Sequence, residues 1–492
     1  MKITARSATI AAIAAFALVP ATALGAAKET YTSVTSSVSS GPTDCNQIHI
    51  LKIGPSTAKT VLVMIPGYLG GSGDFRVIGQ RLTTRFKKLQ VWGVDRRSQC
   101  LEDSSAFVGG TPTQQLGYYI LGQAFGGTTF SPAYVNLTST SSPGAEAART
   151  WGLATTMADI HAVVLAAKAG GRKVILGGHS LGGSLTDIYA TWDFNGTAGY
   201  KDVAGLVLVD GGARGTLGAA PDQTKVNADI SALASGNPFS SLLPGIPVED
   251  QGIFPELAGQ YAIKAAKANS ALQSFLGNVG MGAFTRPTSS GKLNNEAGLG
   301  FAFDRDTSPA LVGLLHMNMG HLKESTNGGA ASWTDGGLTD LKDAKTLWGT
   351  EPGNSVEWYF PKRLGIDVGA ATALTQSSFT DGLGIRTWHL ADVNIPLYAF
   401  ETGLTCSDSV LGDGQGRPLP TDSGFAAWVT GHKTSTCGVL VGAQSFKIAS
   451  KITKSTFTSD HDQEHLDPLV ARATSNKFQT TLVTFLKSLK VS

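Results

Sequence analysis

Four short runs of apolar residues constrain the fold of this chain more than any other feature. They cover residues 60–65, 89–94, 173–177 and 203–209. Such continuous runs, without the polar alternation of a half-exposed strand, are typical of strands buried on both faces of a parallel sheet. Helical patterns at residues 145–169 and 181–190 separate the later runs. This alternation of strand and helix predicts a parallel α/β sheet with right-handed crossovers.

The alternation stops after residue 214. Residues 215–387 contain several helical patterns joined by stretches rich in Gly, Ser and Asn, and no buried strand is evident in them. A further apolar run at residues 394–400 and a last helical pattern at residues 476–489 continue the sheet-and-helix order. We therefore expect a core of residues 46–214 and 388–492, with a large, mostly helical cap inserted at residues 215–387.

Composition agrees with a folded chain that does not bind nucleic acid. Of the 492 residues, 42% are hydrophobic and 15% charged, so the chain can bury a sizeable core. The net charge is only +2, and basic residues form no run longer than the pairs Lys87–Lys88 and Arg96–Arg97. Nucleic-acid binders usually carry a concentrated basic face, which this chain lacks.

The first residues have the pattern of an export signal. Basic residues at the start precede an apolar stretch at residues 8–20, and Ala21 and Ala23 form a small-x-small cleavage pattern. The stretch is too short for a transmembrane helix, and no later segment is long enough, so we expect no stable membrane span. We predict a signal peptide at residues 1–25, a flexible leader at residues 26–45, and a secreted mature protein, extracellular or periplasmic.

Export would permit disulfides among the four cysteines, Cys45, Cys100, Cys406 and Cys437. Three pairings are formally open. Proximity in the sequence favours Cys406–Cys437, which leaves Cys45–Cys100 near the N-terminal strands. No two cysteines have the short spacing of a zinc site, so we expect no bound metal.

The segment Gly178-His179-Ser180-Leu181-Gly182 follows one predicted strand and precedes a predicted helix. A serine exposed in so sharp a turn needs small neighbours two residues away on either side, because larger side chains would collide there. The segment resembles the nucleophile elbow of the α/β-hydrolase superfamily, whose pattern is Gly-x-Ser-x-Gly in this context. The resemblance implies that Ser180 is a catalytic nucleophile.

The same resemblance, which extends through a few landmarks over most of the mature chain, implies an oxyanion hole. In that superfamily one amide comes from the loop after the first strand and the other from the residue after the nucleophile. Here these are the N–H groups of Tyr68 and Leu181, which would stabilise a developing oxyanion. Pro66 stands where many relatives have histidine, a departure that leaves the amide role intact.

The catalytic base and acid are expected after the later strands. His465 lies just before the final helix, where this fold delivers its histidine, whereas His461 sits among acidic residues and is typical of a solvated loop. Two carboxylates end predicted strands and are candidates for orienting the histidine, Asp210 and Glu401. We favour Asp210, since it follows the strand next to that of the nucleophile, and Glu401 stays as the alternative.

These residues together predict a serine esterase or lipase that needs no cofactor. Its partner would be a small-molecule or lipid ester, since a large apolar cap favours a hydrophobic acyl chain or other bulky group. A peptidase or an acyltransferase on the same fold is an alternative. A non-catalytic secreted binding protein on a hydrolase scaffold is another, although it requires the loss of a triad residue and none is visibly lost.

Overall fold

An eight-stranded sheet forms the centre of the computed structural model, which describes residues 27–121, 143–213, 220–240, 250–268, 292–308, 310–406 and 438–492. The spatial order is β1-β2-β4-β3-β5-β8-β11-β12. The strands are β1 (Glu29–Thr35), β2 (Gln47–Ile53), β3 (Thr60–Ile65), β4 (Leu89–Val94), β5 (Lys173–His179), β8 (Leu206–Val209), β11 (Leu397–Thr402) and β12 (Ser455–Asp460). All neighbours from β4 to β12 run parallel, and only the pairings of β2 with β1 and β4 are antiparallel. The predicted mainly parallel α/β sheet is confirmed.

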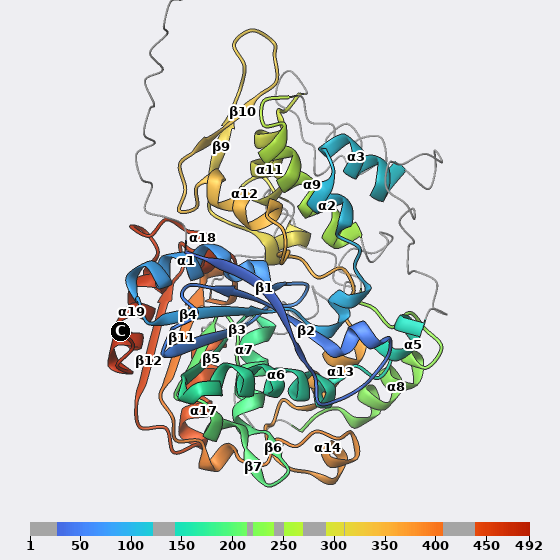
Figure 1. Ribbon diagram of the computed structural model, residues 1–492, viewed down its shortest axis with the longest axis vertical. Coiled ribbons are helices and arrows are strands. Elements are labelled where there is room, and N and C mark those ends of the chain that lie inside the picture. The colour runs from blue at the N-terminus through green and yellow to red at the C-terminus, as the bar shows by residue number, and fades with distance from the viewer. Residues whose placement is uncertain are drawn as a thin grey trace, which may run out of the picture.

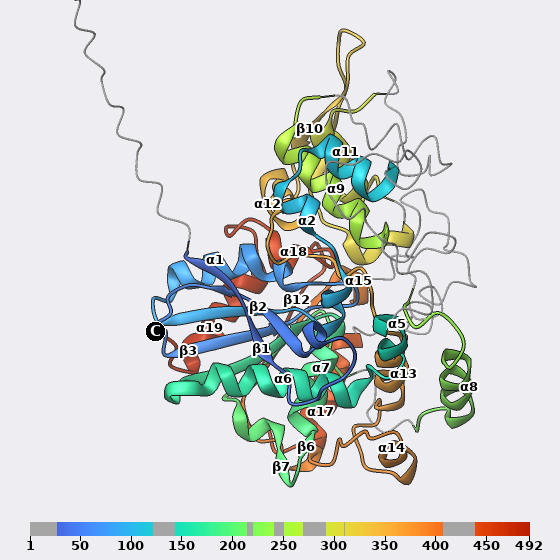
Figure 2. The ribbon, with the colours of Figure 1, turned by 45° about the vertical axis from the view of Figure 1, so that its right-hand side comes forward.

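Helices cover both faces of this sheet, as Figure 2 shows for α1 and α6. They are α1 (Arg76–Arg85), α5 (Pro143–Ala148), α6 (Leu153–Lys168), α7 (Leu181–Thr191), α15 (Gly403–Cys406), α17 (Gly438–Ala449), α18 (Asp467–Val470) and α19 (Lys477–Ser488). A small hairpin, β6 (Asp193–Phe194) and β7 (Thr197–Ala198), follows α7. Every residue of β3 and β4 is buried, which explains why their sequences are apolar throughout.

The helical pattern at residues 145–169 is divided between α5 and α6. A Cβ atom at Gly152 would lie 2.0 Å from a carboxylate oxygen of Asp367, and that carboxylate accepts a hydrogen bond from the N–H of Leu153 at 2.9 Å. A distant side chain therefore caps α6 and fixes its start, an interaction that periodicity alone does not reveal.

The predicted flexible leader at residues 26–45 is wrong for most of its length. Residues 29–35 form β1, an edge strand that pairs with β2 along its whole length. The hydroxyl of Tyr31 donates to Asp95 at 2.8 Å, which ties β1 to the loop after β4. Threonine is a good strand former, and polar residues are common on exposed edge strands, so the Thr/Ser-rich composition that suggested flexibility also suits this position.

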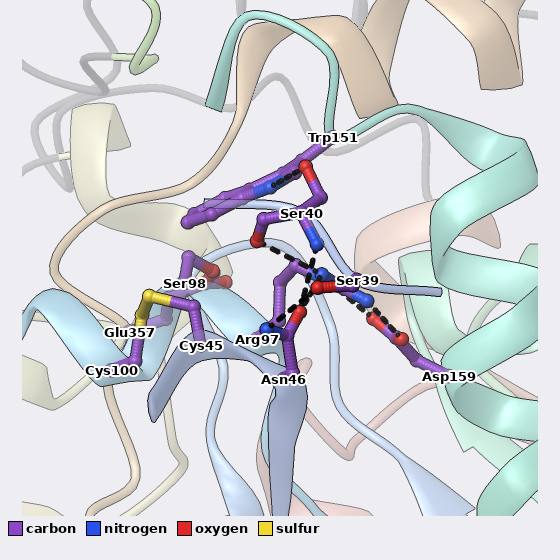
Figure 3. Close-up of a disulfide and its surroundings, with 10 residues drawn as sticks. All are labelled: Ser39, Ser40, Cys45, Asn46, Arg97, Ser98, Cys100, Trp151, Asp159 and Glu357. Carbon is purple, nitrogen blue, oxygen red and sulfur yellow. Dashed lines mark hydrogen bonds and ion pairs between the residues drawn. A yellow bond between two sulfur atoms is a disulfide. The ribbon is translucent and has the colours of Figure 1, made fainter. Parts of the chain in front are cut away.

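Residues after β1 are fastened to the core by a disulfide and by Arg97 (Figure 3). Cys45 is bonded to Cys100, with their Cα atoms 5.0 Å apart, as predicted for this pair. The guanidinium of Arg97 donates to Asp159 of α6 at 2.9 Å and to the carbonyl of Ser40 at 3.3 Å. The predicted Cys406–Cys437 bridge and the signal peptide include residues that lie outside the described ranges.

The structure differs from the single cap predicted at residues 215–387. Some of its elements form a lobe above one edge of the sheet in Figure 1, and others lie beside the core. The lobe contains α9 (Asp250–Lys264), α11 (Asn295–Phe303), α12 (Leu341–Gly349) and the hairpin of β9 (Gly320–Lys323) and β10 (Ser332–Asp335). Beside the core lie α8 (Gln223–Leu233), α13 (Lys362–Ala370) and α14 (Ser378–Gly382). The lobe also includes α2 (Ser105–Gly109) and α3 (Pro112–Leu116), which follow β4 and contact α9.

Two separate segments of the chain therefore build the lobe. Phe107, Tyr118 and Tyr119 from the first segment share one apolar cluster with Leu257 and Trp358 from the second. The aromatic residues after β4 do not repeat at strand or helix spacing, so the sequence gives no sign that they leave the core.

Short 3-10 or π segments link the elements of the core and the lobe at Thr43–Asn46, Ser72–Phe75, Arg97–Leu101, Gly117–Leu121, Ala169–Gly171, Gly199–Asp202, Ala310–Leu315 and Leu390–Asp392. Within the described ranges no helix is both long enough and apolar enough to span a bilayer.

Replacing both Cys45 and Cys100 by serine is expected to lower the free energy of unfolding by about 2–4 kcal/mol, because the bridge restricts the unfolded chain. Urea denaturation followed by circular dichroism would measure the loss. The wild-type protein treated with a reductant while unfolded should lose at least as much after refolding, since the reductant would also break the predicted Cys406–Cys437 bridge. Peptide mapping that found free thiols at both positions would contradict the assignment.

Candidate active site

Ser180 lies in a strained turn between β5 and α7. Its φ of 56° and ψ of −123° place a residue with a side chain in a region that L-amino acids rarely adopt. A Cβ atom at Gly178 would lie 2.1 Å from the backbone of Gly182, and one at Gly182 would lie 2.0 Å from the carbonyl oxygen of Ile65. Only glycine fits at both positions, which is the steric requirement inferred from the sequence.

His465 and Asp210 are joined by a short hydrogen bond. Nδ1 of His465 lies 2.5 Å from Oδ2 of Asp210, and both residues are buried. The carboxylate also accepts from the N–H of Thr402 at 2.8 Å and from its hydroxyl at 2.6 Å. Burial alone would raise the pKa of Asp210, but the hydrogen bonds from His465 and Thr402 outweigh it and hold the pKa below its usual value. The carboxylate stays ionised and leaves Nε2 of the imidazole for another partner.

The alternative acid, Glu401, is directed elsewhere. Its carboxylate accepts hydrogen bonds from the N–H groups of Val439 at 2.8 Å and Leu440 at 3.3 Å, in the first turn of α17. A carboxylate at this end of a helix satisfies amides that have no acceptor within the helix. Of the two candidate acids, the structure brings Asp210 to the histidine and not Glu401. His461 is exposed, as expected of a loop histidine.

Ser180 and His465 line the same pocket, together with Tyr68. In the described part of the chain no hydrogen bond joins Ser180 to His465, and such contacts often tighten only when substrate binds. Leu181 is the first residue of α7, so its N–H has no acceptor in the helix. The N–H of Tyr68 donates to no group among the described residues. Both predicted oxyanion donors are therefore available, and Gly67 beside Tyr68 lies against Ser180.

Apolar side chains form part of the pocket wall, and several of them come from the segment between β8 and β11. Leu314, Leu315 and Trp348 belong to this segment, and Leu466 follows the histidine. Two histidines of this segment, His316 and His321, are not among the lining residues. Hydrocarbon side chains therefore lie next to the serine in this pocket.

Arg96 holds the loop that carries Tyr68. Its guanidinium donates to the carbonyls of Pro66 at 2.7 Å and Gly70 at 3.2 Å, and also to that of Gly67. The same guanidinium pairs with Glu357 at 2.5 Å, and both side chains are almost completely buried. Burial raises the pKa of Glu357, whereas the charge of Arg96 lowers it. Arg96 was not singled out in the sequence, because a pair of adjacent arginines is usually part of a solvated surface.

His179 supports the backbone of the histidine loop. Its Nε2 lies 2.8 Å from the carbonyl oxygen of His465, and the two rings have centroids 4.4 Å apart. Burial, with a smaller contribution from neighbouring His465, lowers the pKa of His179 to about 3. The neutral ring therefore donates from Nε2 and positions the loop. The x of Gly-x-Ser-x-Gly is open to any residue type, so the motif gave no role for His179.

A family model described as alpha/beta hydrolase family matches residues 62–317, which is more than half of the chain. The chain belongs to the α/β-hydrolase family. The match extends from β3, through the elbow at Ser180 and the acid at Asp210, into the lobe. It therefore includes two of the three candidate catalytic residues, Ser180 and Asp210, and His465 lies beyond it. No curated protein sequence matches the chain.

Solved structures with a similar fold include hydrolases of several kinds. A candidate lipase from Sulfolobus solfataricus is 14% identical, with 94% of each chain covered and a TM-score of 0.43. An esterase from Thermogutta terrifontis is 10% identical, covering 94% of this chain and 99% of that one, with a TM-score of 0.34. An epoxide hydrolase from Vigna radiata is 10% identical, covering 94% and 98%, with a TM-score of 0.38.

Replacing Arg96 by methionine is expected to cost about 3–5 kcal/mol of stability, because the buried carboxylate of Glu357 would lose its counter-ion. The double variant Arg96→Met/Glu357→Met should be clearly more stable than the sum of the two single losses predicts. Urea denaturation of the four proteins measures this coupling. As a control, breaking the exposed pair of Lys225 and Asp229 should cost less than about 1 kcal/mol. If the losses of stability in the two single variants were additive in the double variant, the proposed coupling of Arg96 and Glu357 would be wrong.

Proposed function

We propose that this α/β hydrolase is a secreted serine esterase or lipase that cleaves carboxylic esters carrying a hydrophobic acyl chain or another bulky apolar group. The observation that supports it best is the combination of a strained, pocket-facing Ser180 with a histidine already paired to a buried carboxylate. This is the arrangement that nucleophilic acyl transfer needs. Export remains a proposal that rests on the first 25 residues of the sequence.

In the proposed reaction Oγ of Ser180 attacks the ester carbonyl carbon while Nε2 of His465 takes the hydroxyl proton. The carbonyl oxygen becomes an oxyanion that accepts hydrogen bonds from the N–H groups of Tyr68 and Leu181. The intermediate collapses when the C–O bond to the alcohol breaks and His465 returns the proton to the leaving oxygen. Water then attacks the acyl-enzyme with the same base, which releases the acid and restores Ser180. Asp210 stabilises the imidazolium in both steps.

Substrate class is inferred from the pocket walls. Leucines and a tryptophan next to the serine favour an apolar group, because covering hydrocarbon with these side chains removes it from water. A peptidase or acyltransferase would use the same three residues, so the chemistry of the acceptor and of the leaving group must be tested directly. The alternative of a non-catalytic binding protein on a hydrolase scaffold is supported less well, because Ser180, His465 and Asp210 are all present.

Ser180→Ala is expected to reduce ester turnover by about 10⁵-fold or more, because the nucleophile is lost while the elbow backbone is kept. Hydrolysis of p-nitrophenyl esters from acetyl to palmitoyl measures this, beside a peptide amide and an epoxide. Wild-type protein should also react covalently with a fluorophosphonate probe, and Ser180→Ala should not. Labelling that persists in the variant, or turnover confined to the amide or the epoxide, would contradict the proposal.

Asp210→Asn is expected to lower turnover by about 10⁴-fold, since an amide cannot hold the imidazole in the productive tautomer or stabilise its charged form. Glu401→Gln is the matched control, because it removes a buried carboxylate from the neighbouring strand that faces α17 instead of His465. It should reduce turnover by less than about tenfold. Circular dichroism would establish that both variants fold. The reverse order of the two losses would assign the acid to Glu401.

A further inference from the structure

An acidic side chain, Asp74, lines the pocket that contains Ser180 and His465. Asp74 lies in the 3-10 segment Ser72–Phe75, directly after the loop that carries Tyr68, and only 3% of its surface is exposed. Its carboxyl group lies against that loop, because a Cβ atom at Gly70 would be 2.4 Å from Oδ2 of Asp74. Asp74 therefore lies in the pocket wall on the side of the proposed oxyanion hole.

The carboxyl group of Asp74 has no hydrogen-bond partner among the described residues, unlike its acidic neighbours. Asp95 accepts from Ser72 and Tyr31, and Glu357 accepts from Arg96. Asp74 does not cap the helix that follows it either, since neither the 3-10 segment nor α1 has a side-chain cap. The oxygens of this carboxyl group are not fully enclosed by the protein, so a ligand that fills the pocket would have to supply their hydrogen-bond partner.

Burial favours the neutral form of Asp74. Arg96 is the nearby cation, but its guanidinium is already paired with Glu357 and bonded to three carbonyls of the loop. Asp95 adds a like charge. Burial raises the pKa of Asp74 well above its usual value; the charge of Arg96 lowers it in part, and the charge of Asp95 adds a smaller increase. A neutral carboxyl group offers one O–H donor and one carbonyl acceptor.

We propose that Asp74 forms a polar subsite in the catalytic pocket that binds a hydroxyl group of the substrate, so that the preferred substrates are hydroxylated esters. A hydroxyl group matches the carboxyl group because each donates one hydrogen bond and accepts another. A purely hydrocarbon group at this place would displace water and leave Asp74 unpaired. The subsite rests on the proposed ester hydrolysis and adds a specificity-determining residue to it.

The hydroxyl group can belong to the acyl part or to the alcohol part of the ester, and two matched pairs of substrates distinguish these sources. For the acyl part, p-nitrophenyl β-hydroxybutyrate is compared with p-nitrophenyl β-methylbutyrate. For the alcohol part, hydroxyethyl butyrate is compared with propyl butyrate. Within each pair a hydroxyl replaces a methyl group, so the ratio of kcat/KM reports the subsite and does not depend on the amount of folded enzyme.

Wild-type protein should prefer the hydroxylated member of one pair by about tenfold, as expected for one satisfied hydrogen bond in a closed site. Asp74→Leu should reduce that ratio to about one, and Asp74→Asn, which keeps a donor and an acceptor, should retain most of it. Glu256→Met is the matched control, because it removes another buried acid that does not line the pocket, and it should leave the ratio unchanged.

Wild-type ratios near one in both pairs would overturn the subsite without the need for any variant. An unchanged preference in Asp74→Leu would overturn it as well. A preference for butyrylcholine over its uncharged dimethylbutyl analogue that disappears in Asp74→Asn would show an ionised Asp74 and contradict the neutral form. Failure of the proposed function looks different, because wild-type protein would then hydrolyse none of these esters and Ser180 would not react with the fluorophosphonate.

Discussion

Backbone contact between three loops is the constraint on which the whole site depends. The loops after β3, β5 and β8 approach so closely that side chains cannot stand between them. A Cβ atom at Gly182 would lie 2.0 Å from the carbonyl oxygen of Ile65, and one at Gly211 would lie 1.8 Å from that of Ser180. Glycines at these places let neighbouring parallel strands deliver the oxyanion loop, the nucleophile and the acid to one point.

Helix α7 connects the proposed nucleophile, Ser180, to the proposed acid, Asp210. It begins just after Ser180, and two of its side chains reach the turn that follows Asp210. The hydroxyl of Ser184 donates to the carbonyl of Gly212 at 2.8 Å, and Asp187 accepts from the N–H of Ala213 at 2.7 Å. Burial raises the pKa of Asp187 to about 7, so this carboxyl is largely protonated in mildly acidic conditions and can be buried at low cost. Helix α7 therefore links the position of Ser180 to that of Asp210.

The sequence predicted the parts of the fold whose signal is local. Central strands such as β3 and β5 are apolar throughout because both faces are buried, and the elbow shows its glycines directly. The edge strands β1 and β12 were missed, since β12 (Ser455–Asp460) is only half-buried and polar. The split lobe was missed for a different reason: the contact of α2 and α3 with α9 joins residues far apart in the chain.

Within the site, residues with a local sequence signal could be predicted, and residues whose role depends on distant parts of the chain could not. Ser180 and His465 stand in recognisable local settings. Asp210 and Glu401 both end buried strands, and only the amides of α17 that bind Glu401 distinguish them. The roles of Arg96 and Asp74 depend on which loops surround them, so no spacing in the sequence reveals them.

The proposed base, His465, is held by a segment that also supplies part of the pocket wall. Asp467, two residues after His465, accepts hydrogen bonds from the hydroxyl of Thr339 at 2.6 Å and from the N–H of Asn318 at 3.1 Å. Asn318 follows Leu314 and Leu315 of the wall by only a few residues. Because the wall and the histidine loop share these hydrogen bonds, a change in the wall that displaces Asn318 would also displace His465. In the proposed mechanism, substrate selection and proton transfer are therefore coupled through Asp467, because the segment between β8 and β11 contacts both the pocket and the histidine loop.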